Sequence, residues 1–187
     1  MPTLAPPGAG LPRVELWAAR MMFAWHRWTS SRARSGAEIL NQRDQLGALA
    51  RSCPAELASR RVLIPRLRGL EDSSRYWSIY MVVDHVRIVN ANVTTVIREL
   101  GQGRAPDRVA STAGVKPSAD VDATVIERFV TGCDELTRTA EALADLRTER
   151  RYAHPWFGPL DAAGWHAMAG FHMELHHRQA RAILAHG

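Results

Sequence analysis

The stretch from Tyr76 to Leu100 most constrains the fold, because its 25 residues contain neither proline nor glycine. Large apolar residues recur in it every three or four positions, which is the spacing of one face of an α-helix. Gly101 and Gly103 follow, and glycine is typical just beyond a helix C-terminus. A long helix with one apolar face needs other elements to cover that face. The sequence therefore predicts an all-α protein.

Other segments carry the same helical spacing. Residues 13–30 are expected to form the first bundle helix, residues 35–52 an additional helical segment, and residues 54–60 a short helix. A third long helix is expected from Asp120 or Asp122 to about Leu146, and a final one from Asp161. The 13–30 segment is predicted to face the core with Val14, Trp17, Met21, Ala24, Trp25 and Trp28.

Local signals mark where these helices begin. Ser35 and Glu38 have the spacing of a capping box, so Ser35 is expected to cap the 35–52 helix. Residues 1–12 contain four prolines and predict an extended lead-in, followed by a single domain over residues 13–187. The expected architecture is a four-helix bundle with an additional helical segment after the first helix. The loops after the second and third bundle helices favour up-down-down-up order.

The final helix contains a histidine pair, His172 and His176, which lie one turn apart on one face. Buried imidazoles need a partner for each ring nitrogen, and a divalent cation or other polar groups would meet that need. From this helix alone, both interpretations stay open. The same face carries Trp165, Met168, Leu175, Gln179 and Ile183, whereas His166, Met173, His177 and Arg181 fall on another side.

His85 lies four residues after Met81 and shortly before Ile88 and Val89, so it is expected to face the core. By itself, His85 fits a hydrogen-bonded core histidine. A second helix that also turns two histidines inward makes a shared metal ion the stronger interpretation.

Composition narrows the range of partners and compartments. The chain has 24 basic and 19 acidic residues, and its arginines are scattered, so no nucleic-acid partner is expected. Two distant cysteines and no recognisable signal peptide predict a cytoplasmic location, and the apolar stretch from Val14 to Trp28 is too short and too charged for a membrane span. The Met21-Met22-Phe23 run suggests surplus apolar surface and hence a homodimer.

Three motifs together resemble the DinB-like superfamily of metal-binding four-helix bundles. They are residues 76–85 (YWSIYMVVDH), residues 154–160 (HPWFGPL) and residues 172–179 with His172, His176, His177, Arg178 and Gln179. The resemblance covers about residues 14–186 and implies a metal triad of His85, His172 and His176, with His177 as a rival to His176. Gln179 also fits the family pattern.

Three neutral imidazoles suit zinc or nickel and leave a coordination position open. The resemblance implies a thiol S-transferase in which a metal-bound low-molecular-weight thiolate attacks a small electrophile, with Gln179 and Tyr80 as outer partners of the site. Two alternatives stay open. One is a metal-dependent hydrolase or isomerase that uses Asp84 or Glu174, and the other is a non-catalytic, metal-stabilised stress or ligand-binding bundle.

Overall fold

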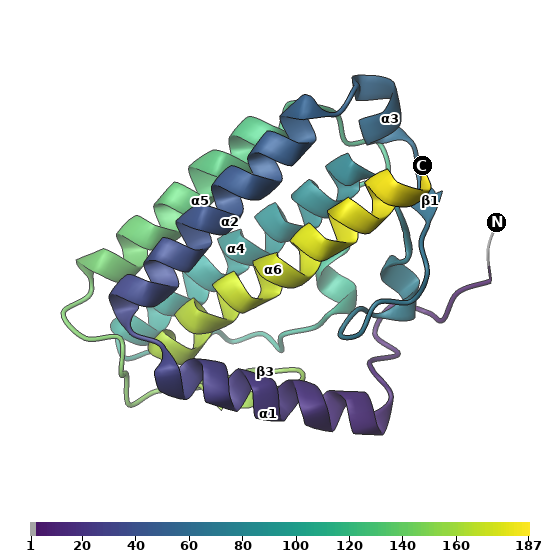
Figure 1. The fold of residues 1–187 in the computed structure, drawn as a ribbon. Coiled ribbons are helices and arrows are strands. Elements are labelled where there is room, and N and C mark those ends of the chain that lie inside the picture. Colours follow the sequence, from purple (N-terminus) through teal and green to yellow (C-terminus); the bar gives the residue numbers. More distant parts are fainter. Residues whose placement is uncertain (1–2) are drawn as a thin grey trace.

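The computed structural model describes residues 3–187 and shows four long helices packed side by side as a bundle (Figure 1). α4 and α2 lie at opposite corners, and each contacts both α5 and α6. Fully buried apolar side chains such as Ile39, Ile97 and Phe129 fill the space between them. The predicted all-α bundle is therefore confirmed. Its helices are α2 (Arg32–Ser52), α4 (Ile79–Gly101), α5 (Val125–Ala142) and α6 (Ala162–His186).

Contacts between the helices give their directions. Arg51, at the end of α2, pairs with Glu127, near the start of α5, so these two helices are antiparallel. Leu143, directly after α5, packs over Gly101 at the end of α4, so α4 and α5 are parallel. Figure 1 shows α6 running in the same direction as α2 and opposite to the other two. The order is up-down-down-up, as predicted.

The prediction for the first bundle helix is wrong. α1 (Arg13–Thr29) crosses one end of the bundle, and α2 is the first helix of the bundle, the place that the sequence predicts for residues 13–30 (Figure 1). The additional helix thus precedes the first bundle helix instead of following it. α2 packs partly through small residues: a Cβ at Gly36 would contact Thr137, and one at Gly47 would contact Val130. Such close packing needs few large apolar residues, so the sequence of α2 carries only a weak apolar stripe.

The helix boundaries follow from hydrogen-bonding side chains. Ser31, not Ser35, caps α2 by accepting a hydrogen bond from the Arg34 amide, and Ser35 is buried inside the helix. Ser78 caps α4, which begins three residues later than predicted because Tyr76 and Trp77 form a strand. Asp161 caps α6 as expected.

The connections contain short elements that the sequence patterns did not indicate. β1 (Val62–Leu63) pairs antiparallel with β2 (Tyr76–Trp77), and β3 (Tyr152–His154) pairs antiparallel with β4 (Gly158–Leu160). The 102–124 connection joins two parallel helices and therefore runs the length of the bundle. Its place beside α4 brings Val115 to His85. The remaining short elements are η1 (Asp72–Ser74) and η2 (Ala113–Val115), whereas α3 (Ala55–Ser59) confirms the short helix predicted over residues 54–60.

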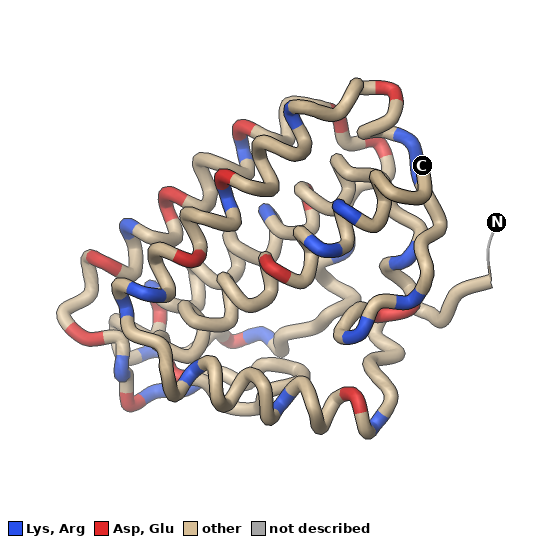
Figure 2. Tube along the Cα trace, in the orientation of Figure 1, with Lys and Arg blue, Asp and Glu red and all other residues tan. Residues whose placement is uncertain are grey.

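Charged residues of both signs alternate over the outside of the bundle (Figure 2). Several of them form ion pairs between helices, including Arg43 with Asp134 and Arg98 with Glu135. Within residues 3–187, every helix falls short of the length and apolar character that a membrane span requires.

Candidate metal centre

Three histidines from two helices converge at one point inside the bundle. His85 comes from α4, and His172 and His176 come from successive turns of α6. One ring nitrogen from each lies within 4.8 Å of the others, and the Nε2 atoms of His85 and His172 are 3.2 Å apart. The structure therefore brings together the three histidines that helical spacing predicts to face the core.

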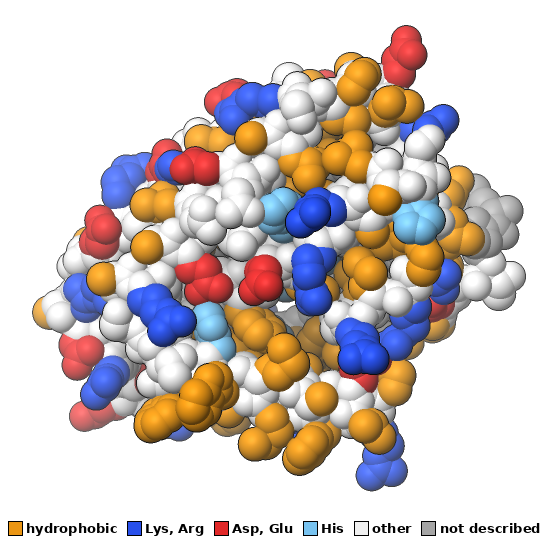
Figure 3. Space-filling model, viewed as in Figure 1, with side chains coloured by type: hydrophobic (Ala, Val, Ile, Leu, Met, Phe, Trp, Pro, Cys, Tyr) orange, Lys and Arg blue, Asp and Glu red, His pale blue; other side chains and the backbone are white. Residues whose placement is uncertain are grey.

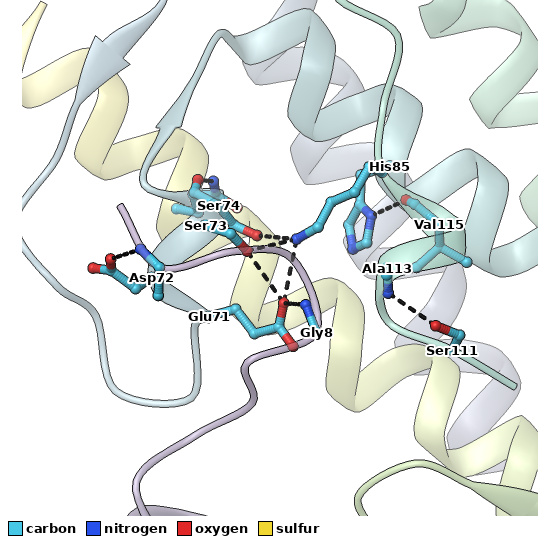
Figure 4. Close-up of polar contacts among 12 residues, drawn as sticks. Gly8, Glu71, Asp72, Ser73, Ser74, His85, Ser111, Ala113 and Val115 are labelled. Carbon is cyan, nitrogen blue, oxygen red and sulfur yellow. Dashed lines mark hydrogen bonds and ion pairs between the residues drawn. The ribbon is translucent and has the colours of Figure 1, made fainter. Parts of the chain in front are cut away.

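The tautomer of His85 follows from its hydrogen bond. Its Nδ1 lies 2.6 Å from the carbonyl oxygen of Val115, which can only accept, so Nδ1 carries the proton (Figure 4). Nε2 is then left as a lone pair directed toward His172. The long 102–124 connection supplies this carbonyl, so the crossover of the bundle orients one imidazole of the cluster.

A chain of hydrogen bonds determines the tautomer of His176 as well. The amide nitrogen of Gln179 donates to the Ser74 carbonyl oxygen at 2.7 Å, which turns the amide oxygen of Gln179 toward His176. That oxygen lies 2.7 Å from His176 Nδ1 and accepts its proton. His176 Nε2 therefore also presents a lone pair. Carbonyl or amide oxygens behind a histidine are the usual means by which proteins orient metal-ligating imidazoles.

His172 differs from the other two, because its Nδ1 is buried and has no hydrogen-bond partner among residues 3–187. Burial lowers the pKa of His85 to about 4, although its bond to Val115 opposes the shift. Burial and the proximity of His85 lower the pKa of His172 well below its usual value, and burial and His172 do the same to His176. All three imidazoles are neutral at physiological pH, as metal binding requires.

The donor set fits a late first-row divalent ion. Zinc–nitrogen bonds of about 2.0–2.1 Å in tetrahedral geometry place ligand nitrogens about 3.3 Å apart. The separation of 3.2 Å between His85 and His172 agrees with that spacing, and His176 lies within the same cluster. Three protein ligands leave at least one position for an exogenous molecule.

A partly buried ion pair lies beside the triad. Lys116 Nζ contacts Glu71 Oε2 at 3.3 Å, Ser73 Oγ at 2.9 Å and Ser74 Oγ at 3.1 Å (Figure 4). Burial lowers the pKa of Lys116 despite the opposing charge of Glu71. Burial alone would raise the pKa of Glu71, but hydrogen bonding from Thr112 and the charge of Lys116 outweigh that effect and lower it.

The triad opens into a cavity of about 700 Å³. α1 forms one wall of it through Glu15, Ala18, Ala19 and Met22. The other walls are largely apolar, with charged groups among them. They include Val89, Val93, Val96, Trp165, Met168, Phe157 and Phe171, together with Glu71, Lys116 and Glu174. A cavity of this size accommodates a small organic molecule beside the histidines.

His154 also lines this cavity, and the sequence patterns did not single it out as a site residue. Its Nδ1 accepts hydrogen bonds from the backbone amides of Trp156 and Phe157, so the ring proton is on Nε2. Burial lowers the pKa of His154 to about 4, which keeps this ring neutral. His154 therefore offers an N–H donor to a bound molecule. Only the folding of the β3–β4 hairpin against α6 reveals this position.

The other candidate residues lie outside the triad. His177 points away from the triad and contacts Gln42, and Asp84 binds Arg87 and the Ser118 amide. Tyr80 is buried and, within the described part of the chain, its hydroxyl has no hydrogen bond to the triad. Glu174 lines the cavity.

Comparison with known proteins shows the family of the chain and agrees with its fold. The sequence model of the DinB superfamily matches residues 38–180, which is most of the chain and excludes α1. No curated protein matches the sequence. The crystal structure of TT2238, a four-helix bundle protein, is similar in fold, with a TM-score of 0.60 and 21% sequence identity over 81% of this chain and 99% of that chain.

Proposed function

Because the chain belongs to the DinB superfamily and three inward-facing histidines converge on a cavity, we propose that it is a divalent-metal-dependent enzyme acting on small molecules, specifically a thiol S-transferase. The observation that carries the proposal is the pair of determined tautomers. Val115 and Gln179 hold protons on the outer nitrogens of His85 and His176, so both inner nitrogens are free to ligate. His85 Nε2 lies 3.2 Å from His172 Nε2, and His172 Nδ1 is buried without a partner among the described residues, so hydrogen bonding within the cluster leaves a buried imidazole nitrogen unsatisfied.

In this proposal His85, His172 and His176 hold a zinc or nickel ion. When bound, the ion would lower the pKa of a thiol or water molecule in its open position. The protein supplies the orientation of the imidazoles, because the Ser74–Gln179–His176 chain and the Val115 carbonyl prevent ring rotation. The apolar cavity walls limit water around the reacting groups and leave space for an electrophile.

His154 has a distinct role in the proposed reaction. Its Nε2–H faces no protein acceptor within residues 3–187, whereas its Nδ1 is committed to the backbone. It therefore donates a hydrogen bond to the bound electrophile and positions it. A carbonyl or similar oxygen on the electrophile would meet this requirement.

Metal-dependent hydrolysis is the second candidate, and Glu71 favours it. Glu71 lines the cavity, and its Oε1 is buried without a hydrogen-bond partner in the described residues. A water molecule in the cavity could donate a hydrogen bond to this oxygen, whereas the ion pair with Lys116 lowers the pKa of Glu71 and makes it a weaker base. A test of thiol binding separates the two reactions.

The test begins with metal content, measured by elemental analysis of the untagged protein. His176→Ala should lose the metal, whereas His177→Ala should retain it, because His177 is the adjacent histidine but points toward Gln42. The cobalt-substituted protein should then change its absorption spectrum when a low-molecular-weight thiol is added.

Each result has a defined meaning. Equal metal content in both variants, or none in the parent protein, would contradict the triad as a metal centre. Metal without a spectral response to thiols would favour hydrolysis or a non-catalytic role. If chelation then lowered the melting temperature sharply and no hydrolysis were detected, the ion would be mainly structural.

A further inference from the structure

The outer face of α1 carries a row of large apolar side chains that nothing in residues 3–187 covers. We call this row the outer stripe. Its members are 54–81% exposed, and Met22 beside it is 62% exposed. Figure 3 shows these hydrophobic side chains along the lower edge of the molecule, where α1 lies. The outer stripe consists of Val14, Trp17, Met21, Trp25 and Trp28.

The opposite side of α1 is attached to the protein. Phe23 is buried and stacks on Phe157 with ring centroids 4.3 Å apart. Arg20 donates to the Trp156 carbonyl at 2.6 Å, and Arg27 pairs with Asp161 at 2.9 Å. These contacts hold α1 in one orientation, so the outer stripe is presented to solvent as a rigid surface.

The outer stripe is large enough to be an interface. With about 250 Å² for a whole tryptophan side chain, its three tryptophans alone expose on the order of 500 Å². The largest apolar patch on a typical monomer is about 300–600 Å², and a stable protein interface buries about 800 Å² per partner. The tryptophans supply more than half of that area before Val14 and Met21 are added.

The spacing of the outer stripe indicates what covers it. The intervals between its residues are three, four, four and three, so the stripe is symmetric about Met21. When two copies of α1 pack antiparallel, Trp17 of one lies opposite Trp25 of the other, and Met21 lies opposite Met21. We propose that this face binds a second copy of the chain through antiparallel α1 helices related by a two-fold axis.

Two other partners explain the surface less well. A helix that lies on a membrane needs free basic residues along its polar face, but Arg20 and Arg27 are engaged within the protein. An unrelated protein partner would not require a stripe that is symmetric about its own centre. A two-fold dimer uses the same surface in both copies, and the symmetric spacing places each apolar residue of one outer stripe opposite an apolar residue of the other.

The proposed dimer also bears on the cavity, because the inner face of α1 forms one of its walls. A second copy packed on the outer stripe would hold that wall in place. The dimer does not depend on the metal or on the reaction, so its test stands apart from that of the triad.

The first test is the molar mass by light scattering across a concentration series. The parent protein should have the mass of two chains, and Met21→Glu should have the mass of one, because it places two carboxylates at the two-fold axis. Leu57→Glu is the matched control, since Leu57 on α3 is 43% exposed and lies outside the stripe. It should remain dimeric, and circular dichroism should show that both variants are folded.

The second test is oxidative cross-linking, which reports the direction of the pairing. Met21→Cys should form a disulfide between copies, whereas Val14→Cys should not, because its two copies would lie about 20 Å apart in an antiparallel pair. The native Cys53 and Cys133 are buried and serve as an internal background. Equal cross-linking of the two variants would overturn the antiparallel arrangement.

Two results would overturn the dimer itself. They are a monomeric parent protein and a Met21→Glu variant that stays dimeric. If the parent protein is monomeric and also sediments with anionic phospholipid vesicles, the outer stripe would be assigned to a membrane surface.

Discussion

α1 and α4 carry similar apolar stripes, but the stripe of α4 is buried and that of α1 is exposed to solvent. The stripe of α4 includes Val93, Val96 and Ile97, which are almost completely buried inside the protein, where α4 packs against α5 and α6. Within residues 3–187, the outer stripe of α1 has no covering element, and only Phe23 of that helix is buried. The comparison shows that helical spacing identifies an apolar face but does not identify the surface that covers it.

The largest expected difference in the free energy of unfolding comes from truncating one side chain of the apolar stripe on each helix. Ile97→Ala should lower the free energy of unfolding by about 2–5 kcal/mol, because Ile97 is fully buried and leaves a cavity. Trp25→Ala should change it by less than about 0.5 kcal/mol at concentrations where the protein is monomeric, because Trp25 is 65% exposed. Urea denaturation measures both, and similar losses would contradict the contrast between the helices.

The next largest expected effect is a loss of stability at acid pH, caused by a buried histidine on α6. His166 on α6 is buried, its Nε2 has no partner among the described residues, and burial lowers its pKa to about 4. Between pH 6.5 and 4, His166 is therefore protonated in the unfolded chain but stays neutral in the folded chain. The stabilising effect of neutral His166 is complete above pH 6.5 and is lost as the pH falls toward 4.

His166→Leu isolates this effect. Between pH 6.5 and 4, the metal-free variant should lose about 3 kcal/mol less unfolding free energy than the metal-free parent, since one pKa unit corresponds to about 1.4 kcal/mol. Denaturant titrations at several pH values measure the difference. Parallel pH profiles for the two proteins would show that His166 accepts a proton without unfolding.

A smaller effect separates two glutamines that each contact a histidine on α6. Gln179→Ala should weaken metal binding about 10- to 100-fold, because it removes the acceptor that orients His176. Gln42→Ala should leave affinity unchanged, because its partner His177 lies outside the triad. Competition with a chromogenic chelator measures both affinities. A loss in the Gln42 variant equal to that in the Gln179 variant would point to a general effect on folding.

The smallest effect concerns the turn between α1 and α2. Ser31→Ala should lower the free energy of unfolding by about 1 kcal/mol, because it removes the side chain that caps α2. Ser35→Ala should cost less than Ser31→Ala, since Ser35 lies within the helix and does not cap it. Thermal unfolding followed by circular dichroism compares the two variants. A larger loss for Ser35→Ala would restore the predicted capping box.

The sequence alone determined the long helices and much of the triad geometry. Residues 76–100 contain no helix breaker, so most of α4 was predictable, and helical spacing turned His85, His172 and His176 inward. These features depend on neighbours within one or two turns of the same helix. Local periodicity records such neighbours directly.

Only the tertiary structure decided how the remaining parts are placed. It assigned α2 and not α1 to the bundle, because close packing through Gly36 and Gly47 leaves little apolar signal in the sequence. It also brought His154 and the Glu71–Lys116 pair to the cavity from loops far away along the chain. Contacts between such distant segments have no sequence period, because they depend on how whole helices pack and cross.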